Sequence, residues 1–265
     1  MKIKSFKHAG ILFALCGIFQ VAHAESALLK PGYFTVGMEV SYPPFESYKN
    51  NKVVGIDPTL AKLLAAKMGL KARFSDHKFS SLILGLKANR FDAVISGMYL
   101  LPDRLKQADA IAYTRTGALI MVTKGSQYQP KTKNDLCGLK VGLEQGTTWV
   151  KALSTLSKSY CQANGKAPIQ VLEFPSAPET AQALMSHNVQ AQLEIAGAAR
   201  MFVKRTRGRI TISSPDLVYP QTLGIYFKKG NRRLQTMLEK AMAEIKQDGS
   251  YAKLLKQYNL SAPTH

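Results

Sequence analysis

Residues 92–104 read DAVISGMYLLPDR and decide the fold. Residues 92–95 form a short run typical of a buried strand, and Gly97 permits a close backbone approach. Pro102 suits the first turn of a following helix, which would leave Arg104 near the mouth of the strand. Ligands of open α/β sheets bind beyond the carboxyl ends of the strands, and a guanidinium fork matches a carboxylate. Arg104 is therefore a candidate anion-binding residue; the alternative is an exposed arginine in an ion pair at a helix start.

Strands and helices alternate on both sides of this stretch. Apolar runs predict strands over residues 33–38, 72–75, 118–123, 139–143, 169–174, 189–194 and 223–228. Helical patterns are predicted over residues 57–68, 79–88, 150–158, 178–187, 196–204, 231–247 and 250–258, with Asp57 as the cap of the first helix. Residues 39–45 read as a proline-stiffened loop and 49–52 as a turn. This alternation predicts an α/β fold with parallel sheets.

The first 24 residues read as a signal peptide. Three lysines form a positive n-region, residues 9–21 form an apolar h-region, and Ala22-His23-Ala24 supplies small residues for cleavage. The h-region is shorter than a helix that crosses a membrane. We expect cleavage after Ala24 and a soluble periplasmic protein.

Export changes how the cysteines are interpreted. Cys16 lies inside the h-region after Leu15, where a lipoprotein signal needs a small residue, so no lipid anchor is expected. Cys137 and Cys161 remain in an oxidising compartment, where a disulfide would close a loop of roughly 25 residues and contribute about 3 kcal/mol. Two free buried thiols are the alternative. No metal-ligand spacing is present, and no cofactor is expected.

The chain is strongly basic. Its formal net charge is +19, and removing the three lysines of the signal peptide leaves 33 − 17 = +16. Lys and Arg are spread along the chain, and the densest cluster, residues 204–209, falls at a predicted helix end. We therefore expect a solvated surface facing anionic envelope lipids or polymers, and no nucleic-acid partner.

Gly146-Thr147-Thr148 lies where a predicted strand leads into a helix. Backbone N–H groups at such a helix start bind anions without a charged side chain. The alternative is a threonine helix cap with no ligand. The glycine spacing is that of neither a Walker loop nor a dinucleotide-binding loop.

Five motifs in order, behind the signal peptide, resemble the family 3 periplasmic solute-binding proteins, the amino-acid receptors of ABC importers. They are YPPFE at 42–46, GID at 55–57, FDAVISGM at 91–98 with PDR at 102–104, KVG at 140–142 and QGTT at 145–148. The resemblance runs from about Gly32 to Tyr258. It implies the two-lobe type II periplasmic-binding-protein fold, in which each lobe is a mostly parallel sheet flanked by helices and two hinge strands join the lobes.

The same resemblance implies how the chain divides. Lobe I would comprise residues 25–117 and 219–265, and lobe II residues 118–218, with crossings near Ala118 and Tyr219. The cysteine pair would then lie within lobe II. One ligand would be held in the cleft between the lobes.

Site roles carry over from the family residue by residue. Arg104 matches the arginine that pairs with the ligand carboxylate, and the backbone at Thr148 would share that anion. Gly97 and Tyr99 match positions that contact the amino-acid head group. The remaining expected contacts are aromatic: Tyr42 and Phe79 around the aliphatic part of the ligand, and Trp149 beside the carboxylate. For Phe79 and Trp149, ordinary core packing is the alternative.

Two positions depart from the family pattern. The family usually has an aspartate near residue 195 that binds the ligand α-ammonium, and ungapped alignment places Ile195 there. A shift of one residue places Glu194 there, which we expect, because an unpaired ammonium in a closed cleft is costly. With Ile195 in that place, the ligand need not be an α-amino acid. Tyr99 and Leu101 also replace residues that are commonly small hydroxyls.

Two glutamates indicate the ligand class. Glu39 matches a position that is acidic in histidine-binding and lysine/arginine/ornithine-binding members, and Glu144 matches another position that lines the ligand side chain. Two carboxylates there suit a basic amino acid such as arginine, lysine or ornithine. The alternative for each is a solvent-facing glutamate.

The resemblance therefore implies a monomeric receptor that closes on an amino acid and delivers it to a membrane permease, and not an enzyme. One rival is an exported cyclohexadienyl dehydratase, which acts on prephenate or arogenate with the same fold. Another is a signalling or adhesion protein whose surface is read by a different partner. Turnover of prephenate distinguishes the enzyme from a receptor.

Overall fold

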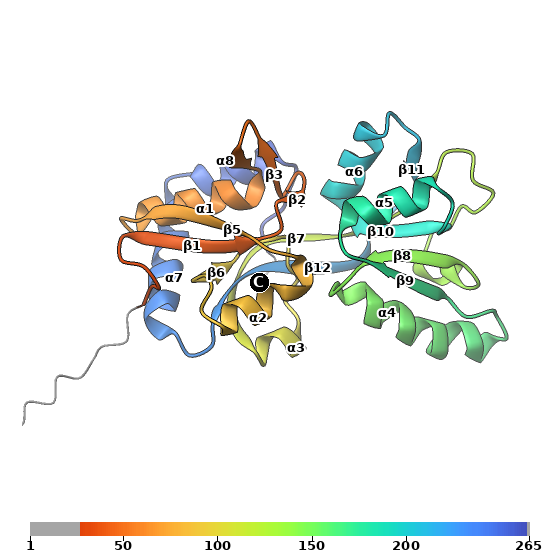
Figure 1. The fold of residues 1–265 in the computed structure, drawn as a ribbon, viewed down its shortest axis with the longest axis horizontal. Coiled ribbons are helices and arrows are strands. Elements are labelled where there is room, and N and C mark those ends of the chain that lie inside the picture. Colours follow the sequence, from red (N-terminus) through yellow and green to blue (C-terminus); the bar gives the residue numbers. More distant parts are fainter. Residues whose placement is uncertain (1–26, 264–265) are drawn as a thin grey trace, which may run out of the picture.

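The computed structural model describes residues 27–263 and divides them into two lobes (Figure 1). The predicted signal peptide, its cleavage site after Ala24 and Cys16 lie outside the described residues. Within residues 27–263, no helix is long and apolar enough to cross a membrane.

One curled sheet runs through both lobes. Its strand order is β5 (Lys71–Asp76), β1 (Tyr33–Met38), β6 (Ala93–Val94), β12 (Val218–Lys228), β7 (Ala108–Thr123), β10 (Ala191–Ile195), β8 (Lys140–Glu144) and β9 (Gln170–Phe174), with β11 (Ile210–Ile212) paired to β7. Strand β1 is parallel to β5 and β6, and β8 is parallel to β9 and β10. The predicted α/β fold with mostly parallel lobes is confirmed.

Helices cover these sheets in each lobe (Figure 1). Beside β1 lie α1 (Ile56–Lys67), α2 (Leu82–Lys87), α3 (Pro102–Leu105), α7 (Arg232–Gln247) and α8 (Ser250–Gln257). Beside β8 lie α4 (Thr148–Leu156), α5 (Ala177–Met185) and α6 (Ala196–Arg205). Short helical turns complete the set: η1 (Phe79–Ser81), η2 (Lys133–Leu136), η3 (Ser157–Cys161) and η4 (Gln162–Asn164). The last two helices, α7 and α8, therefore return to the lobe in which the described chain begins.

The strands that join the lobes are longer than the sequence patterns indicate. Strand β7 was predicted only over residues 118–123 and β12 only over residues 223–228, but they span sixteen and eleven residues. They pair antiparallel, and Val218 faces Ala118 in this ladder. The two predicted crossing points are thus neighbours, and the division into residues 25–117 with 219–265, and 118–218, stays a prediction.

The start of the first helix corrects one expectation. Asp57 does not cap α1, which begins one residue earlier, after Gly55. Its carboxylate is fully buried and accepts hydrogen bonds from Gly97 N (2.7 Å) and Tyr113 Oη (2.9 Å). Gly55 has φ 137°, and a Cβ there would lie 2.0 Å from Phe45 O, so only glycine fits this helix entrance.

A small second sheet was not predicted. Strands β2 (Ser41–Tyr42), β3 (Glu46–Lys49) and β4 (Lys52–Val54) form it, in a stretch interpreted as loop and turn. The turn itself is present, since Asn50 and Asn51 have positive φ between β3 and β4. This sheet carries Tyr42 and Glu46 toward the centre of the molecule, where both are buried.

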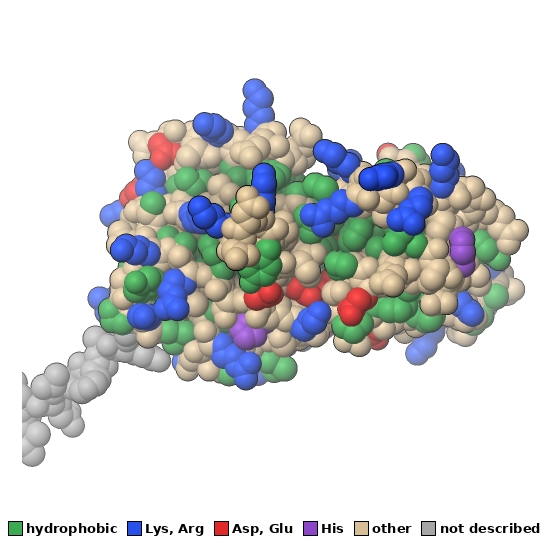
Figure 2. Space-filling model, turned by 45° about the horizontal axis from the view of Figure 1, so that its top comes forward, with side chains coloured by type: hydrophobic (Ala, Val, Ile, Leu, Met, Phe, Trp, Pro, Cys, Tyr) green, Lys and Arg blue, Asp and Glu red, His purple; other side chains and the backbone are tan. Residues whose placement is uncertain are grey.

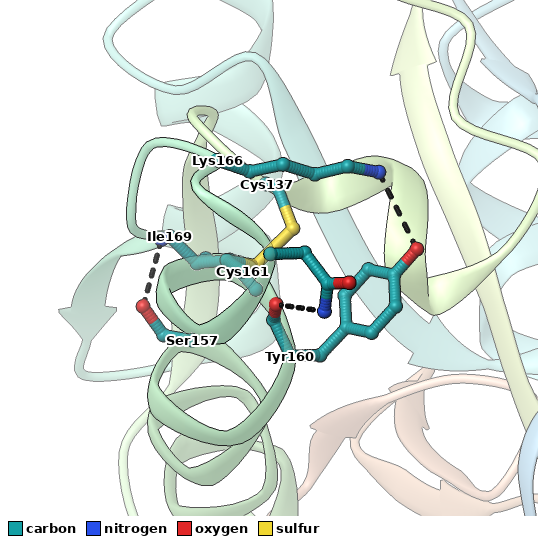
Figure 3. Close-up of a disulfide and its surroundings, with 7 residues drawn as sticks. Cys137, Ser157, Tyr160, Cys161, Lys166 and Ile169 are labelled. Atoms are coloured by element: carbon teal, nitrogen blue, oxygen red, sulfur yellow. Dashed lines mark hydrogen bonds between the residues drawn. A yellow bond between two sulfur atoms is a disulfide. The ribbon is translucent and has the colours of Figure 1, made fainter.

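The predicted disulfide between Cys137 and Cys161 is present (Figure 3). It ties the end of η2 to η3, beside the hydrogen bond from Ile169 N to Ser157 Oγ. On the face shown in Figure 2, Lys and Arg side chains are scattered over both lobes.

Candidate functional site

A cavity lies between the lobes, and both contribute to its wall. It has an empty volume of about 310 Å³, open solvent at its mouth included. Its lining is Tyr42, Phe79, Gly97, Tyr99, Arg104, Glu144, Thr147, Thr148, Trp149 and Ile195. Eight of the ten predicted site residues are in this set, and Glu39 and Glu194 are not. A larger open hollow, with an empty volume of about 1190 Å³, lies at the start of α7, away from these residues.

Gly97 shapes one wall of the cavity. It follows β6 with φ 54°, and a Cβ there would lie 3.2 Å from a ring carbon of Tyr42 and 3.6 Å from Ile195 Cδ1. A side chain would therefore crowd the contact between Tyr42 and Gly97. Because the Gly97 N–H already donates to Asp57, only its carbonyl oxygen is left for a ligand.

Arg104 enters the cavity from α3 and contacts both lobes. Its Nη1 donates to Tyr99 O and its Nη2 to Gly146 O, each at 3.0 Å, and its guanidinium lies 5.5 Å from the centroid of the Phe79 ring. No ion pair within residues 27–263 includes Arg104. Burial lowers the pKa of Arg104, and its remaining N–H groups suit an anion.

The opposite wall is the start of α4. Thr147 caps this helix, and Thr147 and Thr148 line the cavity, so the first backbone N–H groups of α4 lie at its edge. Gly146 has φ 78°, and a Cβ there would lie 2.9 Å from Ser80 Cα of the other lobe. Glycine at 146 therefore lets the two lobes approach here.

Tyr99 and Trp149 meet edge to face, with ring centroids 5.8 Å apart. Both side chains are buried, and neither Tyr99 Oη nor Trp149 Nε1 has a hydrogen-bond partner. Burial raises the pKa of Tyr99 above its ordinary value. Two neighbouring unpaired polar atoms in a cavity wall are costly in the empty protein and are suited to bonding a ligand.

Glu39 and Glu144 are buried side chains that come from opposite lobes. Glu39 follows β1, and its Oε2 accepts from Phe79 N (2.9 Å) while Oε1 lies 3.5 Å from Lys78 Nζ. Glu144 ends β8 and lines the cavity, and its buried Oε1 has no partner. Burial, followed by a hydrogen bond with Glu39, raises the pKa of Glu144 well above its ordinary value.

The end of β10 places Ile195, and not Glu194, in the cavity wall. Successive side chains of a strand point to opposite faces, so the two cannot both line it directly. Glu194 is buried and accepts hydrogen bonds from Tyr42 Oη and from Ile195 N (2.8 Å). Burial raises the pKa of Glu194 to about 7. Its predicted role as the ammonium contact stays a prediction.

Sequence reasoning missed Lys78, and it named Thr147 only as part of the Gly146-Thr147-Thr148 motif. Lys78 directly precedes Phe79, and no motif marks it, because its link to Glu39 depends on how η1 packs against the end of β1. The interlobe pair of Lys151 Nζ and Asp103 Oδ2, at 2.9 Å, was also not predicted. In the described part of the chain, no group of His, Cys, Asp or Glu side chains is arranged to hold a metal ion.

Comparisons with known proteins agree with this geometry. Residues 34–261 match the family model of the bacterial extracellular solute-binding proteins, family 3. The ABC transporter arginine-binding protein 1 of Escherichia coli K12 is 32% identical over 227 residues, which cover 84% of this chain and 88% of that protein. The histidine-binding periplasmic protein of the same strain is 30% identical over 253 residues, covering 91% of this chain and 92% of that protein.

The fold is also similar to solved structures. An ancestral arginine-binding protein bound to arginine superposes with a TM-score of 0.77 at 33% identity, covering 86% of this chain and 98% of that one.

Proposed function

The chain belongs to the bacterial extracellular solute-binding proteins of family 3, and we propose that it captures a basic amino acid in the periplasm for an ABC importer. The relatives named above bind arginine or histidine. Arginine, lysine and ornithine are the proposed ligands. The proposal includes closure of the lobes on the ligand, with delivery to a membrane permease.

One observation carries this proposal. The half-buried Arg104, which has no carboxylate partner within residues 27–263, and the carboxyl group of Glu144 line the same interlobe cavity. Glu39 is buried next to the lining, because it accepts a hydrogen bond from the backbone N–H of Phe79. A ligand with a carboxylate at one end and a cation at the other would match both. Buried charges are stable only when they are paired, so this arrangement favours a ligand that carries both charges.

The head group of the ligand would lie against Arg104. The fork of Arg104 and the N–H groups at the start of α4, near Thr148, would bind its carboxylate. Trp149 Nε1 and Tyr99 Oη, which lack partners, would donate to the same group. Tyr42 and Phe79 would pack against the aliphatic part, as both line the cavity.

The α-ammonium would be bound on the side of β10. Glu194 is the proposed partner. Its carboxylate accepts a hydrogen bond from the hydroxyl of Tyr42, and Tyr42 lines the cavity. Ile195 separates it from part of the cavity, so this contact requires the Tyr42 hydroxyl to share Glu194 with the ligand. A ligand without an α-ammonium would need no such contact.

A thermal-shift screen tests the proposed ligand class. The protein, purified after export of the full chain and refolded to remove bound ligand, is heated with each natural amino acid, ornithine, citrulline or prephenate. A basic amino acid at a hundred times its dissociation constant should stabilise the protein by about 2.7 kcal/mol. Glu39→Gln should weaken this binding markedly, and the exposed Glu239→Gln serves as the matched control.

Two outcomes contradict the proposal. Stabilisation only by ligands without a cationic side chain would remove the role of Glu39 and Glu144. Consumption of prephenate would instead support the dehydratase alternative, because a receptor returns its ligand unchanged.

A further inference from the structure

Lys78 places a positive charge next to the cavity that no motif of the sequence indicates. Its Nζ lies 3.5 Å from Glu39 Oε1, and 59% of the Lys78 side chain is exposed, against 5% of the Glu39 side chain. The next residue, Phe79, lines the cavity, and its N–H donates to the other oxygen of Glu39 at 2.9 Å. Ser41 Oγ donates to Glu39 Oε1 at 3.4 Å. Groups of its own lobe therefore already surround the Glu39 carboxylate.

The charged groups around the cavity have different partners. Arg104 lines the cavity and has no carboxylate partner in the described part of the chain, so its charge is left for the carboxylate of an amino acid. Glu194 is the proposed partner of the α-ammonium, and Glu39 is paired with Lys78. Glu144 lines the cavity, and its buried Oε1 has no hydrogen-bond partner. With Lys78 in place, Glu144 is the carboxyl group that has an oxygen left for a cationic ligand side chain.

We propose that Lys78 determines selectivity in this cavity: by neutralising Glu39, it lowers the preference of the site for cationic over neutral ligand side chains. The inference rests on the proposed function, because it concerns the same cavity. A buried carboxylate without a cation attracts a positively charged ligand and disfavours a neutral one. The ammonium of Lys78 supplies that charge and repels a second cation nearby. Selectivity is a difference of two affinities, so both effects reduce it.

The exposure of Lys78 makes its charge separable from the packing of the site. Its ammonium stays in water, so pairing with Glu39 costs little desolvation. The cavity wall is formed instead by the neighbouring Phe79, whose backbone N–H donates to Glu39 whatever side chain stands at position 78. A substitution of Lys78 therefore changes the charge beside the cavity and leaves its lining in place.

The experiment is calorimetric titration of the refolded protein with L-arginine and L-citrulline, which has a neutral ureido group in place of the guanidinium. Lys78→Met keeps a long unbranched side chain and removes the charge. In this variant the ratio of the citrulline to the arginine dissociation constant should rise about fivefold, or about 1 kcal/mol, and arginine should bind more tightly. Lys87→Met is the matched control and should leave the ratio unchanged, because Lys87 is an exposed residue of α2 in the same lobe.

The Glu39→Gln background tests whether Lys78 acts through Glu39. In the Glu39→Gln/Lys78→Met double variant, removal of the lysine no longer exposes a carboxylate to the ligand. The ratio should therefore change by less than about twofold relative to Glu39→Gln alone. A purely structural role of Lys78 at the start of η1 would change the ratio equally in both backgrounds.

The outcomes separate this inference from the proposed function. An unchanged or smaller ratio in Lys78→Met, with arginine still bound, overturns the role of Lys78 and leaves the receptor function standing. An equal rise in Lys87→Met, or an equal change in the Glu39→Gln background, also overturns it. If citrulline binds none of these proteins, the arginine dissociation constant decides, and no tightening in Lys78→Met overturns the inference. If no basic amino acid binds the unmodified protein or Lys78→Met, the proposed function fails, and the inference fails with it.

Discussion

Arg104 Nη2 donates a hydrogen bond to Gly146 O at 3.0 Å, so a single side chain connects the two lobes. Its Nη1 is held by Tyr99 O in its own lobe. The contact with Tyr99 O restricts the guanidinium within its own lobe, so less side-chain entropy is lost when an anion binds to it. Closure and recognition of the carboxylate depend on the same residue.

Arg104→Lys keeps the positive charge but removes the planar set of N–H donors of the guanidinium. Because an ammonium cannot contact Tyr99 O, Gly146 O and a carboxylate with the same geometry, affinity should fall on the order of 100-fold, or about 2.7 kcal/mol. Isothermal titration calorimetry measures the change, with the exposed Arg205→Lys on α6 as the control. Equal losses in the two variants would show that Arg104 does not bind the ligand.

Trp149→Phe removes one N–H group and keeps an aromatic ring. A neutral hydrogen bond contributes about 1 kcal/mol, so affinity should fall roughly fivefold. The ligand-free protein should be no less stable, because Nε1 has no partner to lose. Chemical denaturation without ligand checks this second point, and a large loss of stability there would indicate that Trp149 is only a core residue.

The site was more predictable than the elements around it. Arg104 and Thr148 lie in contiguous motifs that resemble those of the family, and both line the interlobe cavity; their roles in binding stay predictions. The link between Lys78 and Glu39 depends on how η1 packs against the end of β1, whereas the influence of Glu39 on Glu144 depends on how the two lobes meet. No sequence pattern indicates this influence, because Glu39 and Glu144 are far apart in the chain and on different lobes.

Asp57 illustrates a second limit. An aspartate before a proline is the usual sign of a helix cap, and that local signal predicted its role wrongly. The side chain instead turns inward, to the N–H of Gly97 and the hydroxyl of Tyr113, because residues from distant segments offer it better partners than its own helix. Hydrogen bonds to distant segments therefore take the place of the predicted helix-capping hydrogen bond.

Glu46 and Asp57 should make stability depend on pH. Burial raises the pKa of both side chains, and each carboxyl also acts on the other. The folded protein then binds more protons than the unfolded chain, so the stabilising contribution is complete below about pH 4 and is lost as the pH rises through the folded pKa values. The free energy of unfolding should fall by about 3 kcal/mol between pH 4 and 8.

Urea denaturation at several pH values measures this dependence. Glu46→Gln removes one acid of the pair and should flatten the profile, whereas Glu239→Gln on the exposed face of α7 should not. A free energy of unfolding that increases between pH 4 and 8 would contradict the raised pKa values of Glu46 and Asp57.

The Cys137→Ser/Cys161→Ser double variant should lose stability without losing affinity. The two cysteines are separated by 24 positions, so the closed loop contributes about 3 kcal/mol in the chain-entropy model. Neither cysteine lines the interlobe cavity. Denaturation and ligand titration of the double variant test both statements, and a matching loss of affinity would show that the disulfide supports the site.

The most direct test is calorimetric titration of the refolded protein with L-arginine, L-lysine and L-ornithine. The account predicts that at least one of them binds with one molecule per chain, and that Arg104→Lys and Glu39→Gln each weaken it. Binding confined to ligands that lack an α-ammonium or a cationic side chain would contradict it, and would favour Ile195 over Glu194 as the residue that faces the head group.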